Sequence, residues 1–371
     1  MGTHPVGVGL VGAGVISNQY LENLTAFPDV RVVIVGDIDT SRAEVQAAKY
    51  EIPEWGTGTA VLAHPDVEIV VNLTIPAAHA EVSSAALRAG KHVWSEKPLA
   101  VDRASARALL EQAAAAGLRV GVAPDTVLGP GVQTARRAIG RGDIGTPLSA
   151  QTVMQYAGPD AWHPSPEFLF ARGAGPLYDM GPYYVTVLVN LFGPVARVAA
   201  VGSTSRTVRT IQSGPRAGTT FPVEVPTHVA ALAQFEGGEV SESVFSFDSP
   251  LTRTGVVEIT GTEGTLKMPD PNAFAGAVRI TRAQAHGSDR EWETVVPAGI
   301  ETGRGIGVLD MARAIRSGAP HIASGEVGYH VLDTLVSIDE AAASGETVPV
   351  ESSVGAIPLV PEDRDPFILT L

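Results

Sequence analysis

One short segment near the middle of the chain holds a carboxylate and a phenol at helical spacing. In GAGPLYDMGPYY, residues 173–184, Asp179 and Tyr183 are four residues apart, with Gly181 and Pro182 between them. Residues four apart share one face of a helical turn, so both side chains can point at a common site even where the proline bends the helix. A carboxylate beside a phenol can hold or move a proton. The competing interpretation is a kinked helix whose tyrosines pack in a core.

A glycine-rich turn near the start of the chain has the pattern of a dinucleotide-binding loop. GLVGAGVIS, residues 9–17, places Gly12 and Gly14 between an apolar strand and a helix, with Ser17 where a third small residue is usual. The first glycine lets the chain turn, the second lets the backbone approach a pyrophosphate, and the helix N-terminus stabilises the phosphate charge. Asp37 ends the next apolar run, where a carboxylate can bind an adenosine ribose and repel a 2′-phosphate. The cofactor expected is therefore NAD in preference to NADP.

A lysine ends another apolar strand. Lys97 lies in SEKPLA, residues 95–100, where burial disfavours an unpaired ammonium. An earlier strand ends at Thr74 and Pro76, and proline cannot continue a ladder, so the chain turns out over the crevice where open α/β sheets bind ligands. Lys97 is either a solvated strand end or a reactive group, and His79 either starts the next helix or contacts the ligand.

Alternating strands and helices would position these groups. Apolar, β-branched runs alternate with helical patterns at residues 6–12, 30–37, 67–74, 91–98 and 118–124. Such runs predict a parallel sheet covered on both faces, which is a doubly wound α/β, or Rossmann, domain. We expect it to span residues 1–124 and to bind NAD.

The pattern changes after residue 124. Alternating strands at 228–236 and 239–248 flank Gly237 and Gly238, and a similar stretch follows at 255–268, which predicts antiparallel hairpins. We expect residues 125–371 to form an α+β domain with a large open antiparallel sheet, for substrate binding and oligomerisation. An uncovered sheet face usually packs against something, so a homodimer or homotetramer is expected.

Composition bounds the partners. Of 371 residues, 44% are hydrophobic and 18% charged, and the net charge of -14 repels nucleic acid and anionic lipid. No run reaches the ~18 apolar residues of a membrane helix, and the N-terminus lacks the build of a signal peptide, so we expect a cytoplasmic protein. The histidines show no metal-ligand spacing and the chain has no cysteine, so no metal is expected.

These motifs together resemble the Gfo/Idh/MocA oxidoreductases, the glucose-fructose oxidoreductase and inositol dehydrogenase family. The resemblance covers nearly the whole chain, and its most specific part is the AGKHV and EKPLA strings within residues 89–100. It implies an N-terminal nicotinamide-binding domain, a C-terminal domain with a large open sheet, and substrates that are mostly sugars and cyclitols. It also implies that Lys97 is the active-site lysine of the EKP motif.

The segment around Asp179 departs from the family pattern. The resemblance implies that Asp179 is the aspartate of an Asp-x-Gly-x-His motif, and Tyr183 stands where histidine is commonest. Tyrosine occupies this position in the glucose-fructose oxidoreductase and dihydrodiol dehydrogenase branches, so a proton donor and acceptor is retained. Thr186 replaces an aspartate that often follows, which weakens the transfer of substrate detail from inositol or glucose dehydrogenases.

The expected site residues fall into three sets. The catalytic residues are Lys97, Asp179 and Tyr183. The cofactor-binding residues are Gly12, Gly14, Val15, Ile16, Asp37, Thr74, Pro76, His79, Glu96 and Lys97. The substrate-binding residues are Lys97, Asp125, Trp162, His163, Arg172, Asp179 and Tyr183.

The function predicted is NAD-dependent oxidation of a secondary hydroxyl of a sugar, glycoside or cyclitol, or reduction of the corresponding ketone. Hydride goes to the nicotinamide, and the proton passes through Tyr183 or Lys97, with Asp179 orienting them. Two alternatives stay open: a non-catalytic regulator that binds nucleotide and sugar, and a dihydrodiol-type or carbonyl reductase. The chain has no basic stretch for binding DNA.

Overall fold

A computed structural model describes residues 4–282 and 291–371 of the chain. Its residues form two compact units that are not contiguous in sequence. Unit 1 comprises residues 1–133, 298–332 and 357–371, and unit 2 comprises residues 134–297 and 333–356. Each unit has a sheet and a core of its own.

Unit 1 is built on a parallel sheet of six strands in the order β3-β2-β1-β4-β5-β6. The strands are β1 (Val6–Val11), β2 (Val30–Gly36), β3 (Glu54–Gly56), β4 (Ile69–Asn72), β5 (His92–Ser95) and β6 (Val120–Val122). The order reverses between β1 and β4, which is the topology of a doubly wound dinucleotide-binding fold. The predicted fold class is confirmed for this unit, and the short edge strand β3 was not predicted.

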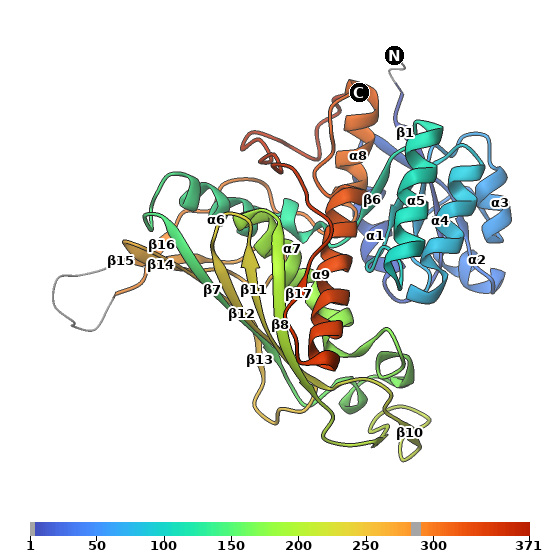
Figure 1. The fold of residues 1–371 in the computed structure, drawn as a ribbon. Coiled ribbons are helices and arrows are strands. Elements are labelled where there is room, and N and C mark those ends of the chain that lie inside the picture. Colours follow the sequence, from blue (N-terminus) through green and yellow to red (C-terminus); the bar gives the residue numbers. More distant parts are fainter. Residues whose placement is uncertain (1–3, 283–290) are drawn as a thin grey trace. The chain divides into compact units, whose positions relative to one another are not determined.

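Helices connect the strands of unit 1. They are α1 (Ser17–Leu24), α2 (Thr40–Lys49), α3 (Gly58–Ala63), α4 (His79–Arg88) and α5 (Arg103–Ala116), with 3-10 turns η1 (Pro76–Ala78) and η2 (Asp125–Leu128). Figure 1 shows α4 and α5 lying side by side. The α5 ends follow from sequence, because the Asp102 side chain accepts from the Ser105 N–H at 2.8 Å and Gly117 stops the helix at φ +64°.

Two later segments complete unit 1, so a single boundary after residue 124 does not describe the compact units. Helix α8 (Ile306–Ser317) packs against β6 and α1 (Figure 1). A Cβ on Gly307 would lie 2.0 Å from the buried indole of Trp94, so glycine is required for this packing. Arg316 of α8 forms a bidentate pair with Glu68 at 2.6 and 2.7 Å.

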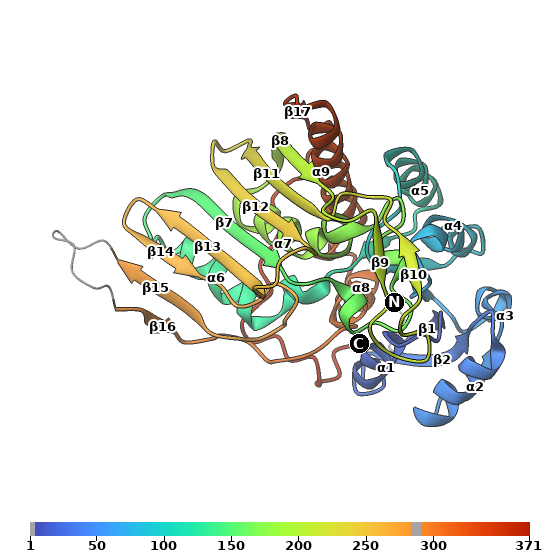
Figure 2. The ribbon, with the colours of Figure 1, turned by 90° about the horizontal axis from the view of Figure 1, so that it is seen from below.

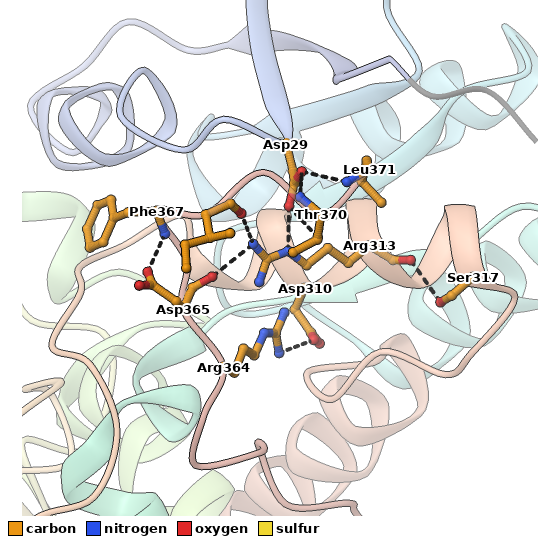
Figure 3. Close-up of polar contacts among 10 residues, drawn as sticks. Asp29, Asp310, Arg313, Ser317, Arg364, Asp365, Phe367, Thr370 and Leu371 are labelled. Atoms are coloured by element: carbon orange, nitrogen blue, oxygen red, sulfur yellow. Dashed lines mark hydrogen bonds and ion pairs between the residues drawn. The ribbon is translucent and has the colours of Figure 1, made fainter.

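A buried carboxylate holds the end of residues 357–371 in unit 1. Asp29, 0% exposed, accepts from the backbone N–H groups of Thr370 and Leu371 at 2.8 and 3.0 Å (Figure 3). Its other oxygen accepts from the Thr370 hydroxyl and from Nε of Arg313, both at 2.7 Å. A second pair joins Arg364 to Asp310 of α8 at 2.6 Å. The segment is thus fixed through polar contacts at both of its halves.

Unit 2 contains a nine-stranded sheet in the order β16-β15-β14-β13-β7-β12-β11-β8-β17. The strands are β7 (Pro147–Gln155), β8 (Val195–Ser203), β11 (His228–Phe235), β12 (Val240–Ser246), β13 (Arg253–Gly261), β14 (Gly264–Lys267), β15 (Val278–Arg282), β16 (Glu293–Val295) and β17 (Val348–Pro349). The predicted hairpins β11–β12 and β13–β14 are confirmed. The sheet is mixed, because β12 pairs with β7 in parallel. Strands β9 (Val208–Thr210) and β10 (Thr220–Pro222) form a separate ribbon.

One face of this sheet is covered by α7 (Gly175–Phe192), which contacts β7, β11 and β12 (Figure 2). The core beneath it includes Tyr184 and Phe245, whose rings meet edge to face at 5.8 Å. Residues 134–140 of α6 (Pro130–Gly140) and 333–344 of α9 (Gly325–Ser344) also belong to this unit, and short turns η3 (Pro159–Ala161) and η4 (Glu167–Leu169) precede α7. Within the described parts of the chain, no helix is long and apolar enough to cross a membrane.

We predict that Asp29→Asn lowers the free energy of unfolding by about 3 kcal/mol, because an amide turns one N–H group toward donors that now meet a carboxylate. Burial raises the pKa of Asp29, but the hydrogen bonds from Thr370, Arg313 and Leu371 outweigh it and hold the pKa below the usual 3.8. The stabilisation is therefore complete above the unfolded pKa and is lost as pH falls through the lowered folded pKa.

Denaturant unfolding of both proteins across the acid range checks this, and the difference between them should shrink at the lowest pH. The control is Asp66→Asn, which breaks an exposed pair with Arg31 and should cost less than about 1 kcal/mol. Equal losses in the two variants would contradict the role of Asp29.

Candidate active site

The glycine loop of unit 1 brings two strand ends into close contact. Gly12 has φ +106°, and a Cβ there would lie 2.7 Å from the carbonyl group of Leu73. Only glycine fits this backbone and this approach. A Cβ on Gly14 would meet nothing within 4 Å, and Val15 is 89% exposed, so the loop leaves its outer side open where α1 begins. Ile16 follows, half-buried, at the start of that helix.

Asp37 is held against this loop. It follows β2 and is 7% exposed. Its Oδ2 accepts from the backbone N–H of Ala13 at 2.7 Å, and its Oδ1 accepts from the N–H of Asp39 at 2.8 Å. Each oxygen keeps a further lone pair for a ribose hydroxyl. The predicted neighbourhood of glycine loop and carboxylate is present.

Strand register brings Lys97 to the same edge of the sheet as the glycine loop. Val11 at the end of β1 pairs with Asn72 of β4, and Asn72 pairs with Ser95 of β5. The residues that follow these strands therefore leave the sheet side by side. Lys97 is half-buried two residues beyond Ser95, and its backbone N–H donates to the Glu96 side chain at 3.1 Å.

Hydrogen bonds made by the side chains of Asn72 and His79 hold the loop after β4. Asn72 accepts from the backbone and hydroxyl of Thr74 at 3.2 and 2.6 Å. His79, 1% exposed, places its two ring nitrogens 2.9 Å from the Thr74 carbonyl and 2.7 Å from the Pro98 carbonyl. Burial lowers the pKa of His79, partly opposed by these bonds. The imidazole thus joins the two loops, while Thr74 and Pro76 keep half-exposed surfaces.

Asp125 does not present its carboxylate for a substrate. It is 0% exposed, and its Oδ2 accepts from the N–H groups of Gly305 and Gly307 at 2.8 and 3.1 Å, at the start of α8. Burial raises the pKa of Asp125 to about 6, although Arg304 and the two N–H groups act in the opposite direction. The expected substrate contact is replaced by a helix N-terminus that the sequence pattern did not place nearby.

In unit 2, α7 carries Asp179 and Tyr183 one turn apart, as predicted. Gly175 begins α7 with φ +81°, and Pro176 follows in the first turn, where its missing N–H costs nothing. Asp179 is half-buried and Tyr183 is 5% exposed. Gly181 has a packing role, because a Cβ there would lie 2.8 Å from the side chain of Leu335.

Tyr156, which sequence reasoning missed, lies close to Asp179. It follows β7, and its ring meets Phe247 edge to face at 5.3 Å. Burial and then the charge of Asp179 raise the pKa of Tyr156, while a hydrogen bond with Trp162 lowers it. A phenol with a raised pKa keeps its proton and acts as a hydrogen-bond donor. No local motif marks this tyrosine, because its position comes from strand β7 and α7 meeting in space.

The predicted substrate residues Trp162 and His163 form part of an aromatic cluster. The imidazole of His163 lies between Trp162 and Phe168, with ring centroids 5.5 Å away on each side. Trp162 is 60% exposed and Phe168 50% exposed, so flat apolar surface faces outward. Arg172 is exposed, and its backbone N–H donates to Glu224 at 3.3 Å.

A buried arginine fixes the loop that carries this cluster. Arg209 of β9 donates to Asp160 at 2.7 Å and to the carbonyls of Ala157 and Phe247 at 2.9 and 2.7 Å. It also pairs with Asp248 and lies 5.0 Å over the ring of Phe170. Planar guanidinium groups suit such multiple recognition. The loop is held by charge and hydrogen bonds at its base, which frees the aromatic rings for contact.

Unit 1 has the loop, carboxylate and strand order of a dinucleotide-binding protein. The residues present fit the cofactor: a cradle that a Cβ at Gly12 would fill, a carboxylate placed for a ribose, and the N-terminus of α1 for phosphate. Over residues 4–282 and 291–371, no three His, Cys, Asp or Glu side chains are grouped as metal ligands. The class that this fold and loop define is therefore that of a nicotinamide-dependent oxidoreductase.

The chain belongs to the Gfo/Idh/MocA family of oxidoreductases. Residues 6–123 match the family model described as an oxidoreductase family with an NAD-binding Rossmann fold. Residues 132–267 match the model of the GFO/IDH/MocA C-terminal domain. The predicted family, oxidoreductase activity and NAD cofactor are confirmed.

Individual relatives agree with this placement. The chain is 29% identical over 268 residues to trans-1,2-dihydrobenzene-1,2-diol dehydrogenase of Bos taurus, covering 71% of this chain and 74% of the relative. It is 26% identical over 353 residues to 1,5-anhydro-D-fructose reductase of Ensifer adhaerens, covering 93% and 99%. Among solved structures, an NAD binding oxidoreductase from Klebsiella pneumoniae gives a TM-score of 0.82 at 25% identity, covering 94% and 100%.

We predict that Asp37→Ser lowers the ratio of kcat/KM for NAD over NADP by about tenfold or more, equal to about 1.4 kcal/mol. The serine removes the charge that repels a 2′-phosphate and one of the oxygens available to the ribose. Steady-state kinetics with both cofactors measure the ratio. Asp39→Asn is the control, since it retains the cap on Ser41 at an exposed position and should leave the ratio unchanged. A wild-type preference for NADP would overturn the assignment.

Proposed function

We propose that the protein oxidises a secondary hydroxyl of a sugar, glycoside or cyclitol, or reduces the corresponding ketone, with NAD as hydride carrier. The observation that supports it most is the register of β1, β4 and β5, which puts Lys97 at the edge of the sheet that bears the glycine loop. The substrate class is supported by the E. adhaerens relative, which is named as a reductase of an anhydrofructose and whose match spans 93% of this chain.

The proposed cofactor contacts are those of the glycine loop and its neighbours. Gly12, Gly14, Val15 and Ile16 would receive the pyrophosphate, and Asp37 the ribose. Thr74, Pro76 and Glu96 line the loops that leave the same sheet edge, and His79 holds two of those loops together. When bound there, NAD would supply the acceptor for the hydride that leaves the carbon of the reacting hydroxyl.

The proposed catalytic residues are Lys97, Asp179 and Tyr183. The lysine cation favours a developing alkoxide and aligns the hydroxyl. Tyr183 takes the hydroxyl proton in oxidation and returns it in reduction, with Asp179 orienting the groups. Of the tyrosines in unit 2, Tyr156 suits hydrogen bonding to substrate instead, because burial and Asp179 keep its proton in place.

The proposed substrate contacts are the exposed aromatic surface and nearby charge. Trp162 and His163 offer rings for stacking against the apolar face of a sugar, and Arg172 offers hydrogen-bond donors. Phe168 extends the same surface. Asp125 is left out of this set because its side chain is fully buried and one carboxylate oxygen accepts from the N–H groups at the start of α8.

A vicinal diol on a carbocycle is the second candidate substrate. It is favoured by the B. taurus relative, named for a dihydrobenzene diol, and by the exposed rings of Trp162 and Phe168, which suit a flat apolar ring. The other alternative from the sequence, a regulator that binds NAD without turnover, is not favoured, because the family that the chain matches is one of oxidoreductases.

Self-association is part of the proposal. On the sheet face away from α7, Val201, Leu232 and Val240 are 72%, 58% and 46% exposed, and strand register puts them on that one face. A homodimer or homotetramer that covers this face would remove the apolar surface from water. A cytoplasmic location stays a prediction of the sequence.

We predict turnover when sugars, glycosides, cyclitols and cyclic diols are screened with NAD by nicotinamide absorbance. Lys97→Ala should lose about 10² or more in kcat/KM on every substrate found, with cofactor affinity measured by calorimetry retained. NAD binding without turnover of any compound would favour the regulator. Unchanged turnover in Lys97→Ala would show that Lys97 has no catalytic role and is only a solvated residue at the end of a strand.

We predict that Tyr183→Phe retains the fold and cofactor affinity and lowers kcat by about 10² or more. Wild-type oxidation should rise with pH through an apparent pKa of the coupled groups, and the variant should lose that rise. Tyr184→Phe is the matched control: its hydroxyl accepts from the Gly255 N–H at 2.8 Å, so its loss should lower Tm and spare kcat. A full rate with an unchanged pH profile in Tyr183→Phe would make Tyr183 a packing residue.

A further inference from the structure

A buried hydrogen-bond chain runs from α1 to the segment that contains Lys97. Tyr20 lies in α1 and is 0% exposed. Its hydroxyl donates to Oε1 of Glu96 at 2.9 Å and accepts from the indole N–H of Trp94 at 3.2 Å. Both hydrogen-bonding capacities of the phenol are therefore used inside unit 1.

Both carboxylate oxygens of Glu96 and both of its backbone polar groups form hydrogen bonds. Its Oε2 accepts from the backbone N–H of Lys97 at 3.1 Å. Its own N–H donates to the carbonyl of Asn72 at 2.9 Å, and its carbonyl accepts from the Ser95 hydroxyl at 3.0 Å. With Tyr20 on Oε1, the carboxylate cannot turn without breaking a buried bond. The peptide that leads into Lys97 is fixed by this carboxylate.

Burial and the neighbouring carboxylates keep the Tyr20 hydroxyl protonated, so it acts as a hydrogen-bond donor. Burial first, and then the neighbouring Glu96 and Asp125, raise the pKa of Tyr20 well above its usual value, while the bond from Trp94 and the charge of Arg304 act in the other direction. Arg304 reaches the same region, donating from Nε to the Gln19 side chain at 3.0 Å. A protonated phenol can hold the carboxylate, whereas a phenolate would repel it.

The hydrogen-bond chain also joins two parts of the site that are distant in sequence. Tyr20 lies one turn inside the helix whose N-terminus follows the glycine loop, and Lys97 follows β5. Any displacement of α1 is thus transmitted to Glu96 through a direct bond. A displacement of about 1 Å at a reacting group can cost about 10² in rate.

We propose that Tyr20 is a positioning residue for Lys97, which it orients by fixing the Glu96 carboxylate that holds the lysine's backbone N–H. The proposal rests on the proposed function in one respect, that Lys97 takes part in catalysis. It adds a residue with no contact to the reacting atoms, and it links the orientation of the lysine to the helix of the glycine loop.

Kinetics of Tyr20→Phe, Glu96→Gln and the double variant test the proposal. Tyr20→Phe should lower kcat about tenfold, with a smaller effect on the KM for NAD. In the Glu96→Gln background the same change should add little, because the two residues act in series. Additive losses in the double variant, or a fall in kcat that only follows the unfolded fraction, would overturn the proposal.

Tyr329→Phe is the matched control. Its hydroxyl accepts from Arg107 at 3.1 and 3.3 Å in the same unit and has no bond to Glu96. Its loss should leave kcat and the pH profile unchanged. A drop in kcat equal to that of Tyr20→Phe would show that any lost tyrosine hydroxyl in unit 1 has this effect.

A readout without turnover separates this proposal from the proposed function. Reductive methylation followed by peptide mass spectrometry gives the reactivity of Lys97, with Lys49, Lys91 and Lys267 as internal references. The rate at Lys97 alone should change in Tyr20→Phe. That change without turnover of any compound in the screen would keep the positioning role and reject the proposed substrate class, and an unchanged rate at Lys97 would reject the positioning role.

Discussion

The contact between the glycine loop and the end of β4 is the constraint on which the candidate site of unit 1 depends. The backbone of Gly12 lies so close to Leu73 that a Cβ would fall 2.7 Å from its carbonyl group. That approach keeps β1 and β4 adjacent at the point where the strand order reverses. Asp37, the Thr74 loop and Lys97 then take their places from strand register and short hydrogen bonds. A side chain at residue 12 would disturb all of them at once.

In unit 2, a long irregular loop carries exposed aromatic rings, and its base is held by a buried arginine. Arg209 does this from a position 4% exposed, by satisfying carbonyl oxygens and carboxylates around one guanidinium. Removing one partner of a buried arginine is costly, so each of these contacts contributes to holding the loop. The loop base is therefore rigid, while Trp162 and Phe168 keep exposed surface. The exposed rings can therefore be replaced without disturbing the base of the loop.

The features that could be predicted from the sequence are those marked by short local patterns. The glycine loop, Asp37, the EKP lysine and the spacing of Asp179 and Tyr183 are short patterns, and the structure has the strands and helices expected around them. Contacts between distant segments left no such pattern. The pairing of Arg316 with Glu68, the capping of α8 by Asp125, and the bond from Tyr20 to Glu96 join residues that sequence spacing cannot relate. The contacts of Arg316 and Asp125 join residues 298–332 to the N-terminal segment of unit 1, so this unit also contains segments that lie after residue 124.

Unit 1 consists of three segments that are far apart in the sequence, so the ribosome synthesises them at different times. Residues 134–297 are synthesised between the first segment of unit 1 and the second. At about 5–20 residues per second, this interval lasts roughly ten to thirty seconds. Throughout it, Trp94 lacks the helix that packs on it through Gly307, and Asp29 lacks the residues that fill its hydrogen bonds. Until these later segments have been synthesised, the first 133 residues lack part of their packing and hydrogen bonding, so unit 1 becomes complete only after most of the chain has been translated.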